Sequence, residues 1–425
     1  MELLEKILSK KNLDNAYECV YKNKGASGVD GVTVDELFAY LQEYKEEILW
    51  QIRNRKYKPQ PVRRVCIPKD NGKMRKLGIP AVVDRVIQQA IVQVLTPIYE
   101  QQFSDNSYGF RPGRSCEQVV IKALECFNDG YDWIVDIDLE SFFDEVNQDK
   151  LMAIIHRTIK DNDVISLIRK FLQIGVMEKG VIQETKKGTP QGGNLSPLLS
   201  NIMLNELDKE LESRGLNFVR YADDCLIMVR SEKAANRVME SITTFITKKL
   251  GLKVNMEKSK VAKPNEIKYL GFGFYKKFNQ NQWRPKPHIK TVEKFIYKIN
   301  CILRRNKGIS LDERLKELKY LIVGWVNNFR IGDMKSFLRD LDSKIRRKLR
   351  AIIWKQWKVI KKRYKSLRKL GISHRDAYVT SNSRKGYYHI AHTRVLEQAI
   401  TKERLNKRGL VNALDHYLRV HINTN

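Results

Sequence analysis

Two adjacent aspartates interrupt an otherwise apolar stretch near the middle of the chain, and they restrict how that stretch can fold. Asp223 and Asp224 lie within Phe218–Val229, between two runs rich in apolar and strand-forming residues. Such runs form strands, and acidic residues between them are accommodated where the chain turns. The stretch therefore predicts a hairpin, from about 217 to 229, with both carboxylates at its tip. By themselves, two aspartates in a turn indicate turn formation more often than a functional site.

A second acidic cluster changes that interpretation. The run 133–139 predicts a short strand that carries Asp136 and Asp138, the latter 85 positions before Asp223. Asp136 and Asp138 share one face, because strand side chains alternate. Grouped carboxylates are costly unless cations neutralise them. Mg²⁺ prefers hard oxygen ligands, and two such ions can stabilise the attacking and leaving oxygens of phosphoryl transfer. The two clusters together predict the chemistry of a polymerase.

The charge of the chain predicts a polyanionic partner, with nucleic acid as the first expectation. The formal net charge is +30, far more than solubility requires. Residues 276–425 hold 38 basic and 11 acidic side chains, whereas residues 1–275 hold 41 and 38. The run Ser343–Lys369 has thirteen basic residues, no acid and three interspersed aromatics, which favours nucleic-acid contact over a solvated helix face. The basic residues expected to make this contact are Arg346, Arg347, Lys348, Arg350, Lys355 and Lys358.

The sequence contains no sign of a membrane or export segment. No run of 18 apolar residues occurs, and the N-terminus lacks the layout of a signal peptide. The six cysteines form no Cys-x-x-Cys pair, which indicates neither a disulfide framework nor a zinc site. We therefore expect a soluble, intracellular protein with no membrane partner.

Hydrophobic periodicity and turn residues predict the remaining elements. In the first fifty residues, helices flank a glycine-containing loop at 23–31. Two strands, 62–67 and 73–79, enclose the turn Asp70-Asn71-Gly72. Helical segments are expected at about 83–100, 116–128 and 151–171 and, beyond a domain boundary near residue 276, at 292–303, 311–329 and 334–357.

The strands around Asp70-Asn71-Gly72 also carry cations that could bind a nucleotide triphosphate. Lys73 and Arg75 share a strand face, and Lys69 lies across the turn. A solvated basic hairpin is the alternative. The stretch 188–197 has glycines that permit close backbone approach and a Ser-Pro pair that opens a helix, although as a bare string it could be an ordinary loop.

Taken in order, these segments resemble the sequence blocks of reverse transcriptases. Forms such as Gly-Thr-Pro-Gln-Gly-Gly and Tyr-Ala-Asp-Asp are similar to those of bacterial group II intron-encoded reverse transcriptases, also called maturases. Tyr-Ala-Asp-Asp alone is a weak signal, whereas six blocks in the correct order are a specific one. The blocks cover most of residues 60–275 and comprise Arg63–Pro80, Asp136–Asp144, Thr189–Pro197, Tyr221–Asp224, Gly251–Lys260 and Tyr269–Phe274.

The resemblance implies a role for individual residues. Asp138, rather than Asp136, would join Asp223 and Asp224 as ligands of two Mg²⁺ ions, with Mn²⁺ as a substitute, because the family places an aromatic residue five positions later, where Phe143 stands. Phe143 would exclude a ribose 2′-hydroxyl, and a core aromatic is the alternative. The other implied roles are triphosphate contacts for Lys69, Arg75 and Arg63, a nucleotide-pocket contact for Gln191, a pyrophosphate contact for Lys258 or Lys260, a primer grip of Tyr269, Leu270, Gly271 and Phe272, and a template loop with Asn23, Gly25, Gly28 and Gly31.

The resemblance also implies an α+β right-hand polymerase with fingers, a palm with an antiparallel catalytic sheet, an α-helical thumb and a basic helical C-terminal segment. Many relatives carry an endonuclease domain with His and paired Cys, a pattern that this sequence lacks, so we do not expect the chain to cleave target DNA. The expected parts are an N-terminal extension with the start of the fingers at 1–60, fingers at 61–130, a palm at 131–275 with finger elements near 145–190, a thumb or maturase X domain at 276–345, and a nucleic-acid-binding segment at 346–425.

The first functional hypothesis is an RNA-directed DNA polymerase that extends a DNA primer with dNTPs on an RNA template. It would also assist splicing of its own group II intron RNA and the return of that intron to target DNA. The alternatives are a non-catalytic RNA-binding splicing cofactor, and a reverse transcriptase domesticated for defence or repair. Each implies a nucleic-acid-associated protein of the bacterial cytoplasm, and the sequence leaves its RNA partner and oligomeric state open.

Overall fold

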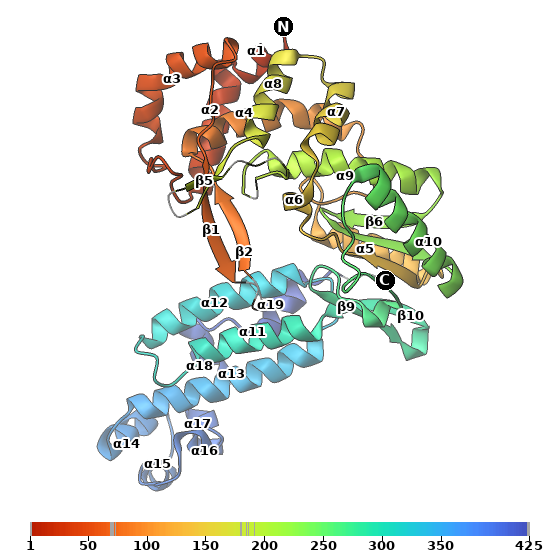
Figure 1. The fold of residues 1–425 in the computed structure, drawn as a ribbon. Helices are drawn as coiled ribbons and strands as arrows, with labels where there is room; N and C mark the ends of the chain where they lie inside the picture. The colour runs from red at the N-terminus through yellow and green to blue at the C-terminus, as the bar shows by residue number, and fades with distance from the viewer. Residues whose placement is uncertain are drawn as a thin grey trace. The chain divides into compact units, whose positions relative to one another are not determined.

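The computed structural model describes residues 2–68, 72, 74–178, 181–183, 185, 187–190 and 192–422. The chain divides into two compact units, Met1–Lys263 and Pro264–Asn425, and both are labelled by element in Figure 1. The division falls twelve residues before the boundary expected near residue 276. The finer subdivision into fingers, palm, thumb and C-terminal segment stays a prediction.

The first unit contains a four-stranded antiparallel sheet in the order β6-β7-β3-β8. Its strands are β6 (Asn217–Tyr221), β7 (Asp224–Val229), β3 (Trp133–Ile137) and β8 (Lys260–Ala262). The apolar runs of β3 and β7 are almost entirely buried, as expected for central strands. Helices α5 (Cys116–Asn128), α9 (Ser196–Ser213) and α10 (Glu232–Phe245) pack against these strands. The predicted hairpin at 217–229 and the strand from Trp133 are therefore confirmed.

A second sheet in this unit has the order β2-β1-β4-β5, in which β1 and β4 run parallel. The predicted basic hairpin forms the β1–β2 half of this sheet, and its turn lies largely outside the described residues. The strands are β1 (Val62–Pro68), β2 (Met74–Ile79), β4 (Val176–Glu178) and β5 (Val181–Gln183). The other helices of the unit are α1 (Leu3–Ile7), α2 (Lys10–Asn23), α3 (Leu37–Arg53), α4 (Val82–Glu100), α6 (Phe142–Glu145), α7 (Gln148–Thr158), α8 (Asn162–Leu172) and the π-helix η1 (Ile246–Leu250).

The segment predicted to be helical at 151–171 is helical over most of its length, but it divides into two helices, α7 and α8. Ile159 is extended, and Asp161 begins the second helix by accepting hydrogen bonds from the backbone N–H groups of Asp163 and Val164. A short acidic side chain at this position satisfies N–H groups that a helix start leaves unpaired. The helices predicted at 83–100 and 116–128 are confirmed within one residue at each end.

The second unit consists of a two-stranded hairpin followed by helices. The hairpin joins β9 (Phe272–Lys277) and β10 (Gln282–Pro287), and the three longest helices are α11 (Ile289–Ile302), α12 (Leu311–Asn328) and α13 (Lys335–Gln356). These three helices confirm the predicted helical segments to within three residues at each end. Among the described residues, no helix is long and apolar enough to cross a membrane. The remaining elements are η2 (Pro264–Glu266), η3 (Phe278–Gln280), α14 (Ile360–Lys369), α15 (His374–Ser381), α16 (Tyr387–Ile390), α17 (Arg394–Ala399), α18 (Lys402–Lys407) and α19 (Ala413–Val420).

Candidate active site

The two adjacent aspartates stand at the tip of the β6–β7 hairpin. Tyr221 pairs with Asp224, so Ala222 and Asp223 form a two-residue turn. Ala222 has φ +57°, a left-handed conformation that costs free energy in a residue other than glycine. Gly109 lies against this turn, since a Cβ atom at that position would approach the Ala222 nitrogen to 2.2 Å. The hairpin tip, called the catalytic turn below (residues 221–224), is thus a strained turn fitted closely to another loop.

The register of β3 brings the second acidic cluster beside this turn. Ile137 pairs with Cys225, which is the last residue pair of β3 with β7. Asp138 follows Ile137 and Asp224 precedes Cys225, so the two acids stand at the same end of the two strands. Burial, together with Asp223, Asp136 and Asp138, raises the pKa of Asp224 to about 6. Burial also raises the pKa of Asp136 to about 6, with Lys260 acting in the opposite direction and Asp138 in the same one. The structure therefore brings together all four acids of the two clusters.

Lys258 is the lysine that reaches these acids. Its Nζ lies 2.8 Å from Oδ2 of Asp138. The Asp138 N–H donates to Ser259 Oγ at 3.0 Å, and the Asn255 N–H donates to the Asp138 carbonyl oxygen at 2.8 Å. Lys260 instead lies in β8 and pairs in register with Asp136. The sequence left the choice between the two lysines open, and the geometry favours Lys258 as the one at the Asp138 carboxylate.

The donor set of this edge suits a hard cation, because it consists of carboxylate oxygens. Asp138 binds the Lys258 ammonium, a positive charge at the place where a metal ion would also meet this carboxylate. Among the described residues, no three His, Cys, Asp or Glu side chains are arranged as a ready metal site. The Lys258 ammonium occupies Oδ2 of Asp138, so a metal ion held by Asp138, Asp223 and Asp224 would share this carboxylate with Lys258 or replace it there.

Phe143 lines a cavity together with two basic side chains that were not predicted from the sequence to bind the nucleotide. The Phe143 ring packs on Phe142 with 5.3 Å between centroids, and it lines a cavity of about 390 Å³ together with Arg64 and Lys76. Arg64 and Lys76 belong to the face of the β1–β2 hairpin opposite to Arg63 and Arg75, because residues alternate along each strand. Neither Arg63 nor Arg75 lines this cavity. The alternation of side chains along a strand is the sequence signal that could have separated Arg64 and Lys76 from Arg63 and Arg75.

Two of the predicted nucleotide contacts, Lys69 and Gln191, lie outside the described residues.

The loop predicted to close over the template is described and is attached to the start of α4. Arg85 donates hydrogen bonds to the carbonyl oxygens of Ala26 and Pro80. Gly28 packs so closely that a Cβ atom there would lie 2.6 Å from the Ala81 Cα. Asn23 and its neighbours line a cavity of about 300 Å³ with Gly192 and Asn194. Gly25 and Gly31, in the same loop, have positive φ angles.

In the second unit, the predicted primer grip is a tight turn. Tyr269 and Phe272 exchange backbone hydrogen bonds of 3.0 and 2.8 Å, and Leu270 and Gly271 between them have φ of +48° and +87°. The Gly271 carbonyl oxygen accepts hydrogen bonds from the His288 N–H and the Thr291 hydroxyl, both at 3.0 Å. A Cβ atom on Gly271 would lie 3.1 Å from the Phe329 ring, so this position favours glycine through both its conformation and its packing.

The predicted nucleic-acid-binding residues of α13 and its C-terminal end differ in exposure. Lys355 and Lys358 are exposed, and Arg346, Arg347 and Lys348 are partly buried. Arg350 is an exception, since its guanidinium is buried and donates to Glu397 at 2.7 Å and to the Ile400 carbonyl oxygen at 3.2 Å. Arg350 therefore joins α13 to α17 and is not available as a surface contact in this structure.

Comparison with known proteins identifies both units. Residues 67–274 match the family model described as reverse transcriptase (RNA-dependent DNA polymerase), and residues 292–371 match the model described as group II intron, maturase-specific domain. The two matches lie in the order expected from the sequence. They confirm the predicted enzyme class, RNA-directed DNA polymerase, and the α+β right-hand polymerase fold of the matched domain.

Three relatives illustrate the similarity. Protein YkfC of Escherichia coli K12 is 34% identical over 62% of this chain and 80% of its own length. The group II intron-encoded protein LtrA of Lactococcus lactis is 42% identical over 48% of this chain and 34% of its own length. A putative COX1/OXI3 intron 2 protein of Saccharomyces cerevisiae is 28% identical over 66% of this chain and 39% of its own length. This chain thus spans most of YkfC but only about a third of LtrA.

Reverse transcriptases generally use divalent metal ions, in agreement with the carboxylates at the catalytic turn. A reverse transcriptase domain together with a maturase domain implies RNA and DNA as substrates and intron RNA as a binding partner. The two domain matches and the relatives agree with each other and with the order of motifs along the sequence. The chain belongs to the family of group II intron-type reverse transcriptases and maturases.

Proposed function

We propose that this protein copies an RNA template into DNA by nucleotidyl transfer supported by two Mg²⁺ ions, for which Mn²⁺ can substitute. The observation that carries this proposal is the strand register that brings Asp138 beside Asp223 and Asp224. Bound between these carboxylates and the dNTP phosphates, the ions would stabilise the attacking and leaving oxygens of the reaction. The protein's own part is to hold the carboxylates in place.

Lys258 is proposed to act on the leaving group. The ammonium on Asp138 offsets part of the negative charge of the acidic cluster while no substrate is bound. With metal ions held by the carboxylates, the Lys258 side chain would be free to turn toward the leaving pyrophosphate, to which it would donate a proton as a general acid. The exposed position of Lys258 supports this movement, because its side chain retains 60% of its accessible surface.

Phe143 is proposed to select the sugar of the incoming nucleotide. A bulky ring beneath the sugar would clash with a 2′-hydroxyl and so favour dNTPs over rNTPs. We retain Lys69, Arg63, Arg75 and Gln191 as proposed contacts of the nucleotide. The cavity at Phe143 adds Arg64 and Lys76 as cations near the same ring.

The remaining contacts are proposed for the nucleic-acid strands. The rigid turn at Tyr269–Phe272 would hold the DNA primer, and the loop at 23–31 would close over the RNA template. The fingers, palm and thumb would follow the subdivision expected from the sequence, with the C-terminal segment binding intron RNA or target DNA. The net charge of +30 supports an association with nucleic acid, which we place in the bacterial cytoplasm as part of this proposal.

The direct test is extension of a DNA primer on an RNA template with dNTPs and Mg²⁺. The unaltered chain should extend the primer, Asp223→Ala should not, and omission of the divalent ion should stop the reaction. A folded protein that binds RNA but extends no primer under any metal condition would contradict the proposal.

A second role is proposed beside catalysis, namely assistance of intron RNA splicing. The maturase-specific match at 292–371 supports it, as does the excess of basic residues in 276–425. Its test is splicing of a group II intron RNA encoded beside this protein, with and without the protein, at a Mg²⁺ concentration too low for the RNA to splice alone.

A further inference from the structure

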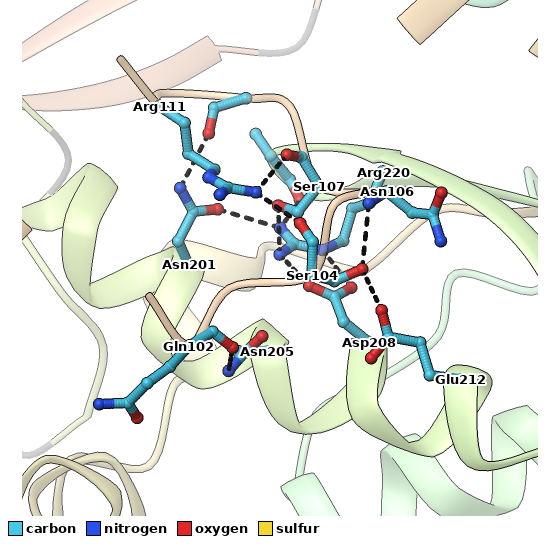
Figure 2. Close-up of polar contacts among 12 residues, drawn as sticks. Gln102, Ser104, Asn106, Ser107, Arg111, Asn201, Asn205, Asp208, Glu212 and Arg220 are labelled. Atoms are coloured by element: carbon cyan, nitrogen blue, oxygen red, sulfur yellow. Dashed lines mark hydrogen bonds and ion pairs between the residues drawn. The ribbon is translucent and has the colours of Figure 1, made fainter. Parts of the chain in front are cut away.

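Behind the catalytic turn lies a fully buried arginine whose guanidinium binds four residues on three segments of the first unit, namely helix α9, the loop around Ser107 and the turn itself. Figure 2 shows Arg220 among Asp208, Asn201 and Ser107. Nε and Nη2 bind the two carboxylate oxygens of Asp208 at 2.7 and 2.5 Å, Nη1 donates to Asn201 Oδ1 at 3.1 Å, and Nη2 also donates to Ser107 Oγ at 2.8 Å. Both Arg220 and Asp208 have 0% exposed surface.

The fifth hydrogen bond of Arg220 reaches the catalytic turn itself. Nη1 donates to the carbonyl oxygen of Ala222 at 2.8 Å. That carbonyl belongs to the peptide group joining Ala222, whose φ is +57°, to Asp223. Since rotation of this peptide group would swing the carboxylates at the tip, the bond fixes the part of the backbone on which their direction depends.

The same network also fixes the loop that presses on the turn. Asn201 donates to the Gly109 carbonyl oxygen at 2.8 Å, and backbone hydrogen bonds of 2.9 Å join Tyr108 to Arg220 and Arg220 to Asn106. A second buried arginine, Arg111, holds this loop by binding Glu100 and the carbonyl oxygens of Ser104 and Ser107. No hydrogen bond of Arg111 to the catalytic turn occurs among the described residues.

A buried ion pair is weak evidence that the pair stabilises the fold, because apolar side chains of similar volume often give a protein of equal stability. Arg220 offers something that an apolar side chain cannot, a directed donor to one carbonyl oxygen, with its remaining donors fixed by three other partners. Such supporting contacts commonly orient metal ligands, and their loss weakens metal binding or activity by roughly 10–100-fold.

We propose that Arg220 is a positioning residue of the catalytic turn, which holds the Ala222–Asp223 peptide group in the orientation that lets Asp223 and Asp224 bind divalent ions. The inference rests on the proposed function of these carboxylates. It assigns to Arg220 an effect on the affinity for metal, separate from the effect of its ion pair on stability.

The test compares Arg220→Lys with Arg111→Lys in the full-length protein. Lysine keeps a positive charge near Asp208 but cannot reproduce the planar set of donors. Arg111→Lys is the matched control, because it alters a buried, ion-paired arginine of the same cluster that makes no bond to the turn. Three quantities are measured for each variant: the melting temperature, Mn²⁺ binding by loss of the free-ion electron paramagnetic resonance signal, and the Mg²⁺ midpoint of single-turnover primer extension.

We expect both variants to melt at lower temperature, and only Arg220→Lys to bind Mn²⁺ about tenfold more weakly and to need about tenfold more Mg²⁺. An Arg220→Lys protein that is folded and has unaltered Mn²⁺ affinity would overturn the inference, as would equal weakening of metal binding in both variants. If Arg220→Lys does not fold, Asn201→Ala loosens the same Nη1 group and should weaken Mn²⁺ binding in the same direction, and unaltered affinity there would again overturn it. The Mn²⁺ measurement needs no turnover, so it distinguishes failure of this inference from failure of the polymerase proposal.

Discussion

The catalytic edge proposed for the first unit (Asp138, Asp223, Asp224 and Lys258) and the basic run of the second unit (Ser343–Lys369) differ in the sign of their charge. They also differ in how the charged side chains are held in place. At the catalytic edge, Asp138 and Asp224 take their places from strand register, and both Lys258 and the turn are fixed by specific hydrogen bonds. In the basic run Ser343–Lys369, lysines such as Lys361 and Lys362 project from α14 into solvent. The first arrangement depends on geometry, whereas the second depends on the amount of charge. Single substitutions should therefore have large effects at the edge and small ones in the run.

The largest expected effect is that of Asp223→Ala, which should lower the rate of DNA synthesis by at least about a thousandfold, since loss of a metal ligand removes several kcal/mol of transition-state stabilisation. RNA affinity should stay within about twofold, because the exposed cations are untouched. Filter binding of RNA and single-turnover extension on the same preparation check both halves. Equal loss of both activities would contradict the division between edge and run.

The next effect separates the two lysines beside the acids. Lys258→Ala should slow nucleotide addition by about a hundredfold, in the range typical for loss of a general acid, and it should leave dNTP affinity nearly unaltered. Lys260→Ala, two residues further along the chain at the start of β8, is the matched control and should slow the reaction far less. Rapid-quench measurement of the addition rate against dNTP concentration distinguishes the two. A greater loss in Lys260→Ala would reverse the assignment.

Phe143→Ala should lower the preference for dNTP over rNTP by roughly 10–100-fold, because the selection relies on a steric clash that alanine cannot make. The neighbouring Phe142 is buried in the core, so Phe142→Leu controls for loss of packing and should alter stability without altering sugar selection. The ratio kcat/KM for each nucleotide in primer extension is the measurement. Unchanged selection in Phe143→Ala would favour the simpler role of a core aromatic.

Sequence patterns predicted most of the catalytic edge because each part of it is local. The adjacent Asp223 and Asp224 between apolar runs predicted the hairpin, and the alternation of Asp136 and Asp138 predicted their shared face. The break between α7 and α8 also had a local signal, the helix-capping Asp161, which a longer apolar periodicity obscured. In these cases the residues that decide the structure lie within a few positions of one another.

What the sequence did not predict depends on partners far away along the chain. Arg220 looks like a strand residue exposed beside acids until Asp208 and Ser107, 12 and 113 positions away, meet its guanidinium. Arg350 was predicted to contact nucleic acid, but it is buried and donates a hydrogen bond to Glu397 on another helix. Trp354 is one of the aromatics of the basic run whose composition favoured nucleic-acid contact, but its side chain is 1% exposed. Burial of a charged or aromatic side chain is decided by tertiary contacts, which composition and periodicity do not specify.

In the basic run, replacement of one exposed lysine by glutamine should weaken binding by a similar, small factor for every RNA sequence and lower the slope of log affinity against log salt by about 1. Replacing Lys361, Lys362 and Lys365 together should lower the slope of log affinity against log salt by up to about 3, since each lost phosphate contact releases about one counterion fewer. Glutamine at the exposed Lys209, Lys233 and Lys248 of the first unit removes the same charge and is the matched control. An equal change of slope in the control would mean that total charge, not this run, governs binding.

The last prediction concerns the stability of the fold, not activity, and involves a buried acid that serves neither region. Asp84 is fully buried and accepts hydrogen bonds from the Tyr57 hydroxyl at 2.6 Å and the Gln60 N–H at 2.9 Å. Burial raises the pKa of Asp84 to about 6, against the opposing effect of these hydrogen bonds. Because this pKa is higher in the folded than in the unfolded chain, the folded state holds the proton more tightly between about pH 4 and 6. The stability that Asp84 contributes is therefore present at about pH 4 and is lost as the pH rises through 6.

Relative to Asp84→Asn, which does not titrate, the unaltered protein should lose about 2–3 kcal/mol of unfolding free energy over that interval. Urea unfolding of both proteins from pH 4.5 to 7 measures the difference, and a gain of relative stability with rising pH would contradict it. Such a result would mean that the Tyr57 and Gln60 hydrogen bonds outweigh burial, and that this acid is held as a carboxylate like those of the catalytic edge.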